Sequence, residues 1–99
     1  MLDGGQYSEL TAFMAIHEAR SFRDAALRLG VTPSALSRTL RRLEDRLGLR
    51  LLNRTTRSVS PTEAGTLLYA KLAPAVAGLE AAVDDVASLG NDPVGRVRL

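Results

Sequence analysis

The chain has 99 residues, 45% of them hydrophobic, which is enough for one small folded domain with or without an extension and excludes a disordered chain. It contains no cysteine, so the sequence offers neither a disulfide framework nor a thiolate metal site. The net charge is +2, but residues 31–60 hold seven arginines and two acidic residues, a net charge of +5, and residues 61–95 carry a net charge of −4. A basic middle beside an acidic C-terminal part predicts a local site for a polyanion.

The first predicted element is a helix over residues 7–20, where the large apolar residues recur at helical spacing. Ser21 is a candidate N-cap, because Asp24 follows three places later as in a capping box. A short second helix is expected over residues 23–29, and Gly30 ends it.

A third helix is predicted over residues 33–47, with Thr32 as its cap, Pro33 in its first turn and Gly48 at its end. One side of this helix is an apolar stripe of Leu36, Leu40, Leu43 and Leu47. The opposite side is polar and consists of Ser34, Arg38, Arg41, Arg42 and Asp45. Hydroxyl and guanidinium groups on an exposed face suit phosphates and base edges.

Between residues 49 and 60 the pattern predicts a two-stranded hairpin, with a polar turn over residues 53–57 between flanking apolar residues. Ser60, Pro61 and Glu63 then predict a helix start, with a serine cap, proline at the first position and glutamate at the third.

The fourth predicted helix covers residues 61–89 and carries an apolar seam with heptad spacing. The apolar seam consists of Leu68, Leu72, Ala75, Leu79, Ala82, Val86 and Leu89. A domain this small cannot bury a seam of that length, so a second copy of the helix is the simplest partner. No uninterrupted apolar run approaches the roughly 20 residues that span a bilayer, so we expect no membrane segment.

Together these elements predict a mainly α fold, a winged helix-turn-helix followed by a long dimerisation helix. The expected divisions are residues 1–60 for the winged part, 61–89 for the linker helix and 90–99 for a hinge and the start of a further domain. In a helix-turn-helix the second helix enters the major groove and its first turns touch base edges. Arg54 and Arg57 lie at or beside the hairpin tip, where a wing can enter a minor groove.

Many short motifs in the chain resemble, in order and spacing, the N-terminal domain of LysR-type transcriptional regulators. They are Ala25-Ala26, Leu29, Val31-Thr32, Leu36-Ser37-Arg38, Leu43-Glu44, Leu47-Gly48, Leu51-Leu52-Asn53-Arg54, Arg57 and Thr62-Glu63-Ala64-Gly65. The resemblance covers about residues 7–95. It implies a homodimer whose long helices pair antiparallel, a site in double-stranded DNA that is an inverted repeat, and a C-terminal domain that senses a small-molecule effector. Half-sites should then lie about 34 Å or a multiple apart.

Carried over by position, the family's DNA contacts fall on residues of the third helix and the wing. They are Thr32 to phosphate, Pro33, Ser34, Ser37 and Arg38 to base edges and phosphates, and Arg54 and Arg57 in the wing. Arg41 and Arg42 are expected to contact phosphates or to be solvated. Pro33 departs from the Gln or Ser of many members and has no side-chain donor, so it can give only apolar contact.

Several alternatives stay open at this point. Arg54 could pair with Glu44 or another acid instead of DNA. Another winged-helix regulator (MarR-like or molybdate-sensor-type) or a protein-interaction module with a basic docking helix would share the basic third helix. A single histidine, no cysteine and no glycine-rich phosphate loop argue against a metal site or an enzyme, and we expect a cytoplasmic protein with no cofactor in this fragment. The full-length protein could also form a tetramer that contains the same dimer of long helices.

Overall fold

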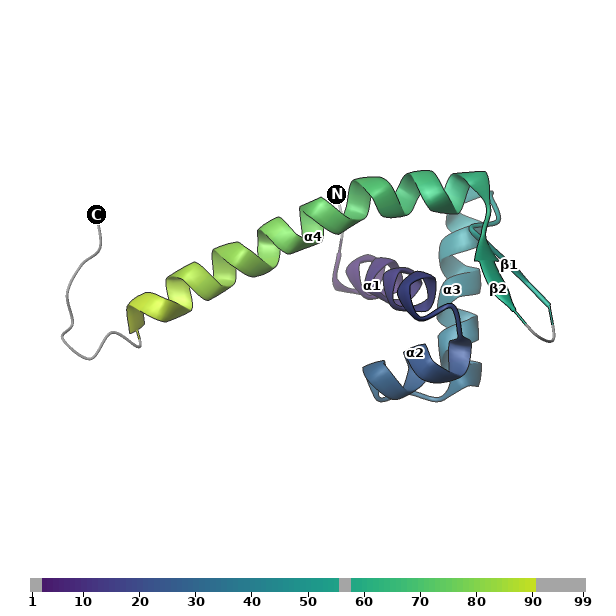
Figure 1. Cartoon of the computed structure of the whole chain (residues 1–99), viewed down its shortest axis with the longest axis horizontal. Helices are drawn as coiled ribbons and strands as arrows, with labels where there is room; N and C mark the ends of the chain where they lie inside the picture. The colour runs from purple at the N-terminus through teal and green to yellow at the C-terminus, as the bar shows by residue number, and fades with distance from the viewer. Residues whose placement is uncertain (1–2, 56–57, 91–99) are drawn as a thin grey trace. The chain divides into compact units, whose positions relative to one another are not determined.

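The computed structural model describes residues 3–55 and 58–90 and divides into two compact units, residues 1–69 and 70–99 (Figure 1). The predicted mainly α fold with a two-stranded wing is confirmed. The elements, in chain order, are α1 (Gly4–Ala19), α2 (Phe22–Leu29), α3 (Pro33–Leu47), β1 (Leu52–Arg54), β2 (Val59–Pro61) and α4 (Glu63–Gly90).

Helix α1 begins three residues earlier than its apolar pattern predicts, because a capping box fixes its first turn. The Asp3 carboxylate accepts the Gln6 backbone N–H at 2.8 Å, and the Gln6 side-chain oxygen accepts the Asp3 N–H at 3.0 Å. The two glycines that follow Asp3 hide this start from a hydropathy pattern. At the other end Arg20 takes a left-handed conformation, with φ of 54°, and its backbone N–H caps the helix.

The predicted caps of α2 and α3 are confirmed. The Ser21 hydroxyl accepts the Asp24 N–H at 3.0 Å, and the Thr32 hydroxyl accepts the Ala35 N–H at 3.1 Å. Gly30 and Gly48 end their helices with φ of 71°, a conformation in which a side chain would be strained. Gly30 at the end of α2 and Thr32 at the start of α3 set the length of the turn between the two helices.

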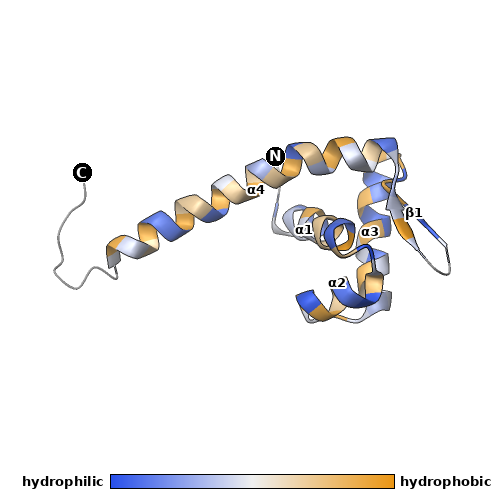
Figure 2. Cartoon of the chain, viewed as in Figure 1, coloured by the Kyte–Doolittle hydropathy of each residue, from blue (hydrophilic) through white to orange (hydrophobic). Residues whose placement is uncertain are grey.

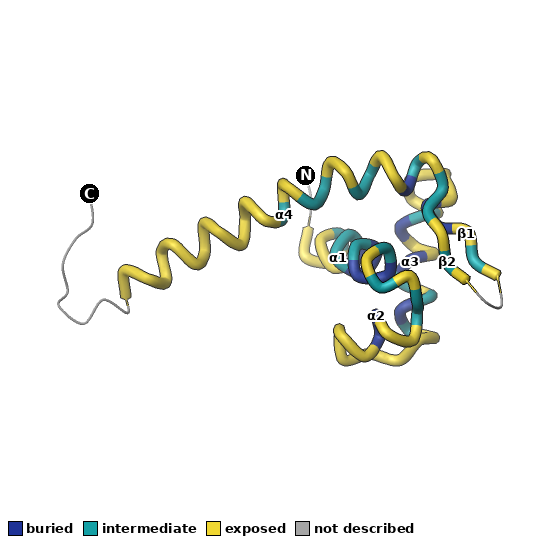
Figure 3. The backbone as a smooth tube through the Cα atoms, viewed as in Figure 1, coloured by how far each residue is buried: buried dark blue, intermediate teal, exposed yellow. Residues whose placement is uncertain are grey.

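The core of the first unit lies between α1, α2, α3 and the first residues after α3 (Figure 3). Its largest fully buried side chains are Phe13, Ile16, Leu40, Leu51 and Leu52. Of the leucine stripe predicted on α3, Leu36, Leu40 and Leu43 are buried, but Leu47 is 46% exposed, because it occupies the last turn before Gly48 ends the helix. The exposed side of α3 is correspondingly polar (Figure 2).

Strands β1 and β2 form an antiparallel hairpin in which Leu52 faces Pro61 and Arg54 faces Val59. A two-stranded hairpin is marginal by itself, so its attachment matters. The Glu44 carboxylate of α3 supplies that attachment, since it accepts the backbone N–H of Leu51 at 2.8 Å and of Leu52 at 3.3 Å. Glu44 is therefore structural, and its partners are backbone groups.

The predicted start of the fourth helix was wrong by two residues. Ser60 and Pro61 belong to β2, and the cap is Thr62, whose hydroxyl accepts the Gly65 N–H at 3.0 Å and donates to the Arg50 carbonyl at 2.7 Å. Because Pro61 pairs with Leu52 in the hairpin, it is part of β2 and the helix begins after it. At this junction the first turn of α4 lies against the backbone of Leu51.

Helix α4 continues without interruption through Pro74 to Gly90. From Ala77 to Gly90 every residue is exposed, including Leu79, Val83, Val86 and Leu89. By length and composition alone α4 is apolar enough to cross a membrane, since an 18-residue window of it has a mean hydropathy of 1.3, although its apolar residues are interrupted by charges. A helix that pairs along an apolar seam has the same composition.

Candidate nucleic-acid interface

The solvent-facing side of α3 gathers six of the residues predicted to contact DNA. We call these six residues the outward face of α3: Pro33, Ser34, Ser37, Arg38, Arg41 and Arg42. Five of them are exposed and Ser37 is half-buried, whereas the leucines on the other side of the helix pack into the core. The predicted division of α3 into a buried side and a polar side is therefore present in the structure.

Arg54, at the end of β1, joins this outward face through two contacts. Its Nη1 donates to the Ser37 hydroxyl at 2.7 Å, and its Cζ lies 4.6 Å from the centroid of the Phe22 ring. The contacts tie together the wing, α3 and α2. The alternative that Arg54 pairs with Glu44 is not what the structure has, because the Glu44 carboxylate accepts the backbone N–H groups that begin the wing.

Sequence reasoning missed Phe22. Its position at the start of α2 gave no sign that its ring would face the wing, since the two are far apart in the chain and meet only in the fold. A shallow hollow lies where Phe22 and Arg54 come together. Its other lining residues belong to α3 and are Pro33, Ser34, Ser37, Arg38 and Arg41.

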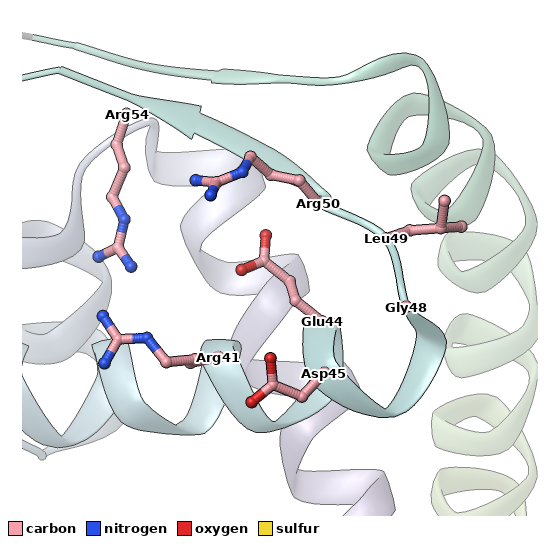
Figure 4. Close-up of a pocket in the computed structure, with 7 residues that line it drawn as sticks. All are labelled: Arg41, Glu44, Asp45, Gly48, Leu49, Arg50 and Arg54. Carbon is pink, nitrogen blue, oxygen red and sulfur yellow. The ribbon is translucent and has the colours of Figure 1, made fainter.

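A second hollow lies toward the C-terminal end of α3 (Figure 4). Arg41 and Arg54 line it as well, and in Figure 4 their side chains extend toward one another from α3 and from the wing. Arg50, which follows α3 in the chain, also lines it and was not among the predicted contacts. Basic side chains thus reach from α3 to the wing, and the acidic side chains of Glu44 and Asp45 line the same hollow.

Arg46 shows why a charge count overstates this surface. Its guanidinium pairs with the carboxylate of Glu9, a buried residue of α1 whose side chain is 7% exposed. The hydrogen bond to Glu9 raises the pKa of Arg46. This arginine therefore neutralises a buried acid and ties α3 to α1, and its charge does not add to the outward face.

A second polar cluster connects α1 to the beginning of α4. The His17 and Tyr69 rings stack with centroids 4.0 Å apart and planes 7° from parallel. The Tyr69 hydroxyl donates to Glu18 at 2.6 Å, and Glu18 also pairs with Arg28 at 2.8 Å. The hydrogen bond to Glu18 raises the pKa of Tyr69, and burial lowers the pKa of His17.

The remaining predicted residues fall in different places. Thr32 is exposed and its hydroxyl caps α3. Arg57 lies outside the described residues. Within the apolar seam, Leu68 and Leu72 are half-buried and the other members are exposed. Among residues 3–55 and 58–90, no group of three or more histidine, cysteine or acidic side chains is placed to hold a metal ion.

The fold and this surface define a class. Two short helices joined by a glycine turn, a second helix with an outward face of hydroxyl and guanidinium groups, and a two-stranded hairpin directly after it are the parts of a winged helix-turn-helix. Residues 7–66 match the model of the bacterial regulatory helix-turn-helix proteins of the lysR family. The chain belongs to this family, as its motifs indicate.

The relatives agree with this membership. The chain is 48% identical over 94 residues to the HTH-type transcriptional regulator PgrR of Escherichia coli, a match that covers 95% of the chain and 31% of PgrR. It is 44% identical over 92 residues to the HTH-type transcriptional regulator PtxR of Pseudomonas aeruginosa, covering 93% of the chain and 30% of PtxR. The chain thus spans about a third of the length of these curated relatives.

Solved structures match the fold as well. The DNA-binding domain of BenM in a complex with benA site 1 DNA superposes with a TM-score of 0.76 at 30% identity, covering 84% of this chain and 93% of that one. Full-length CbnR complexed with its target DNA superposes with a TM-score of 0.70 at 30% identity, covering 84% of this chain and 28% of CbnR.

Proposed function

We propose that this chain is the sequence-specific DNA-binding domain of a transcriptional regulator, and that it acts as a dimer on double-stranded DNA by binding rather than by catalysis. The observation that supports this best is the exposed outward face of α3, which continues into the wing through Arg54. Matching relatives are named transcriptional regulators, and the matching BenM and CbnR structures are DNA complexes.

In this proposal α3 lies in the major groove and the wing reaches an adjacent minor groove. Ser34, Ser37 and Arg38 meet base edges, and Pro33 gives an apolar contact such as one to a thymine methyl. The residues proposed for phosphate or minor-groove contacts are Thr32, Arg41, Arg42 and Arg57, and Arg54 joins the wing to the base-reading side of α3. Arg41 and Arg42 are exposed, so their charges are available for the electrostatic part of the affinity.

The proposed dimer forms along the apolar seam of α4, with the two helices antiparallel. Five of the seam's seven residues are exposed in a single chain, from Ala75 to Leu89. Because a two-fold interface presents two copies of α3 related by symmetry, the DNA site should be an inverted repeat.

For the whole protein we propose a cytoplasmic regulator whose C-terminal domain responds to a small-molecule effector and which assembles as a dimer or tetramer. Family membership and the extra length of the relatives support this part of the proposal. No residue of the chain described above is assigned to effector binding.

Selection of binding sites from random duplex DNA tests the central claim. We expect an enriched inverted repeat, and an affinity that falls steeply with salt because bound phosphates release counterions. A protein-interaction module with a basic docking helix would enrich no sequence, and that result would overturn the proposal.

Arg38→Ala tests the reading role of α3. We expect it to weaken binding to the selected site by roughly 1–3 kcal/mol and to relax preference at one base pair per half-site. Lys71→Ala is the control for the loss of one positive charge, because Lys71 is an exposed cation on α4 and is not among the proposed DNA contacts. Equal losses on selected and random DNA would make Arg38 a phosphate contact only.

A further inference from the structure

The Arg54 guanidinium is held by the protein from two sides. Its Cζ lies over the Phe22 ring, 4.6 Å from the ring centroid, a distance at which a cation is attracted to an aromatic face. Its Nη1 also donates to the Ser37 hydroxyl at 2.7 Å. Phe22 and Ser37 are both half-buried, as is Arg54 itself, so the three side chains form a packed group rather than a freely moving wing arginine.

This arrangement restricts what Ser37 can do. A serine hydroxyl has one hydrogen to donate and two lone pairs that accept. Arg54 occupies one lone pair, and among the described residues the hydroxyl donates to no protein acceptor. The hydroxyl hydrogen is therefore available to an outside acceptor, while the nearby positive charge disfavours an approaching N–H donor.

We propose that Arg54 is a positioning residue for base recognition: clamped on Phe22, it fixes the Ser37 hydroxyl as a hydrogen-bond donor that selects an acceptor edge in the major groove. This inference rests on the proposed DNA-binding function. Acceptor edges there are the O6 and N7 of guanine, the N7 of adenine and the O4 of thymine, whereas the amino groups of adenine and cytosine are donors. Base pairs that present an acceptor opposite Ser37 are preferred.

The opposing role for Arg54 is a plain phosphate contact. The two roles differ in what they do to specificity and to salt dependence. Losing a phosphate contact weakens binding to all sequences and lowers the salt slope by about one, whereas losing a positioning residue changes the preference at one base pair. Arg38, which follows Ser37 in the chain and is exposed, gives the reference for direct reading.

The experiment compares four variants on a panel of the selected site substituted at each base pair, over a range of salt concentrations. Ser37→Ala locates the base pair that Ser37 reads. Arg54→Met removes the charge but keeps the stem, and Phe22→Leu removes the ring but leaves the charge. The fourth variant combines Arg54→Met with Ser37→Ala, and thermal unfolding confirms that each variant is folded.

We expect Arg54→Met and Phe22→Leu each to reduce preference at the Ser37 base pair by about three- to tenfold, the value of one hydrogen bond. The double variant should lose no more preference than Ser37→Ala alone, and the salt slope of Arg54→Met should stay within about half a unit of the parent. Should Arg54→Met be unfolded, Arg54→Lys replaces it, because lysine keeps the charge but lacks the planar fork.

A uniform loss on all sequences with a slope lower by about one would overturn the inference in favour of a phosphate contact. An unaltered preference in Phe22→Leu, additive losses in the double variant or no effect of Ser37→Ala would overturn it too. Failure of the proposed function looks different, since the parent protein would then show no salt-sensitive DNA binding at all.

Discussion

Gly65 is the residue at which the beginning of α4 comes closest to the chain after α3. A Cβ atom at this position would lie 2.0 Å from the Leu51 carbonyl oxygen, which is backbone and cannot rotate away. Gly65→Ala should therefore lower the free energy of unfolding by roughly 1–3 kcal/mol, in the range of overpacked cores. Denaturant unfolding at fixed protein concentration measures this change.

Gly78→Ala is the matched control on the same helix, because a Cβ there meets nothing within 4 Å. It should raise the free energy of unfolding by about 0.5–1 kcal/mol through helix propensity. Equal effects of the two substitutions would mean that the close approach to Leu51 does not exist in solution.

His17 makes stability depend on pH. Burial, with a smaller contribution from Arg20, lowers the pKa of His17, so the folded protein favours the neutral ring that stacks on Tyr69. In the unfolded chain His17 has its ordinary pKa near 6.5, so it binds a proton more readily there than in the folded protein. The stabilisation by neutral His17 is therefore complete above about pH 6.5 and is lost as the pH falls toward the lower folded value.

His17→Phe isolates this dependence, since phenylalanine preserves an aromatic ring and cannot titrate. We expect the midpoint of thermal unfolding to fall further between pH 7.5 and 5.5 in the parent than in His17→Phe. If the unfolding midpoints of the two proteins fell equally with pH, His17 would not contribute to the pH dependence. The carboxylates, which both proteins share, would then account for it.

Among the elements, the wing depends on α3 for its attachment. Glu44→Ala leaves the backbone N–H groups of Leu51 and Leu52 without their acceptor, and both residues are 1% exposed. We expect a loss of roughly 1–3 kcal/mol in the free energy of unfolding, the usual cost of buried unsatisfied donors. Asp45→Ala, an exposed neighbour on the same turn, should change it by less than about 0.5 kcal/mol. Equal losses would place the wing's attachment elsewhere.

The element boundaries show what the sequence could predict. Capping contacts act within three residues, so the sequence showed the caps Ser21, Thr32, Gly30 and Gly48. They predicted the bounds of α3 correctly and those of α2 to within one residue. The start of α4 was misread because Pro61 suits both a first helical turn and an edge strand, and only the pairing with Leu52 decides between them.

The part of the site that lies on α3 alone could be predicted from the sequence. The contacts that join α3 to other elements could not. The spacing places Arg38 opposite the leucine stripe and Ser37 on its flank, and in the structure Arg38 is exposed and Ser37 half-buried. The stacking of Arg54 on Phe22 joins residues 32 positions apart, and the pairing of Arg46 with Glu9 joins residues 37 apart. Neither has a local signature, so a charge count assigned Arg46 to the basic surface.

For the whole molecule, the proposed dimer depends on the apolar seam. Helix α4 combines a membrane-like mean hydropathy with complete exposure from Ala77 to Gly90, a combination that a solitary soluble helix rarely tolerates. The heptad spacing places Leu79 in the middle of the seam, where it is 55% exposed in one chain.

Leu79→Asp should convert the dimer to monomers, because two carboxylates would have to be desolvated close together in an apolar interface. Ala77→Asp is the control, since Ala77 is exposed and lies about 200° around the helix from Ala75 of the seam. Sedimentation equilibrium distinguishes the two variants: we expect a monomer mass for Leu79→Asp and a dimer mass for Ala77→Asp. A dimeric Leu79→Asp would reject the seam as the interface.

A monomeric variant should also bind the inverted repeat with the affinity of one half-site, because the two copies of α3 are no longer linked in one dimer.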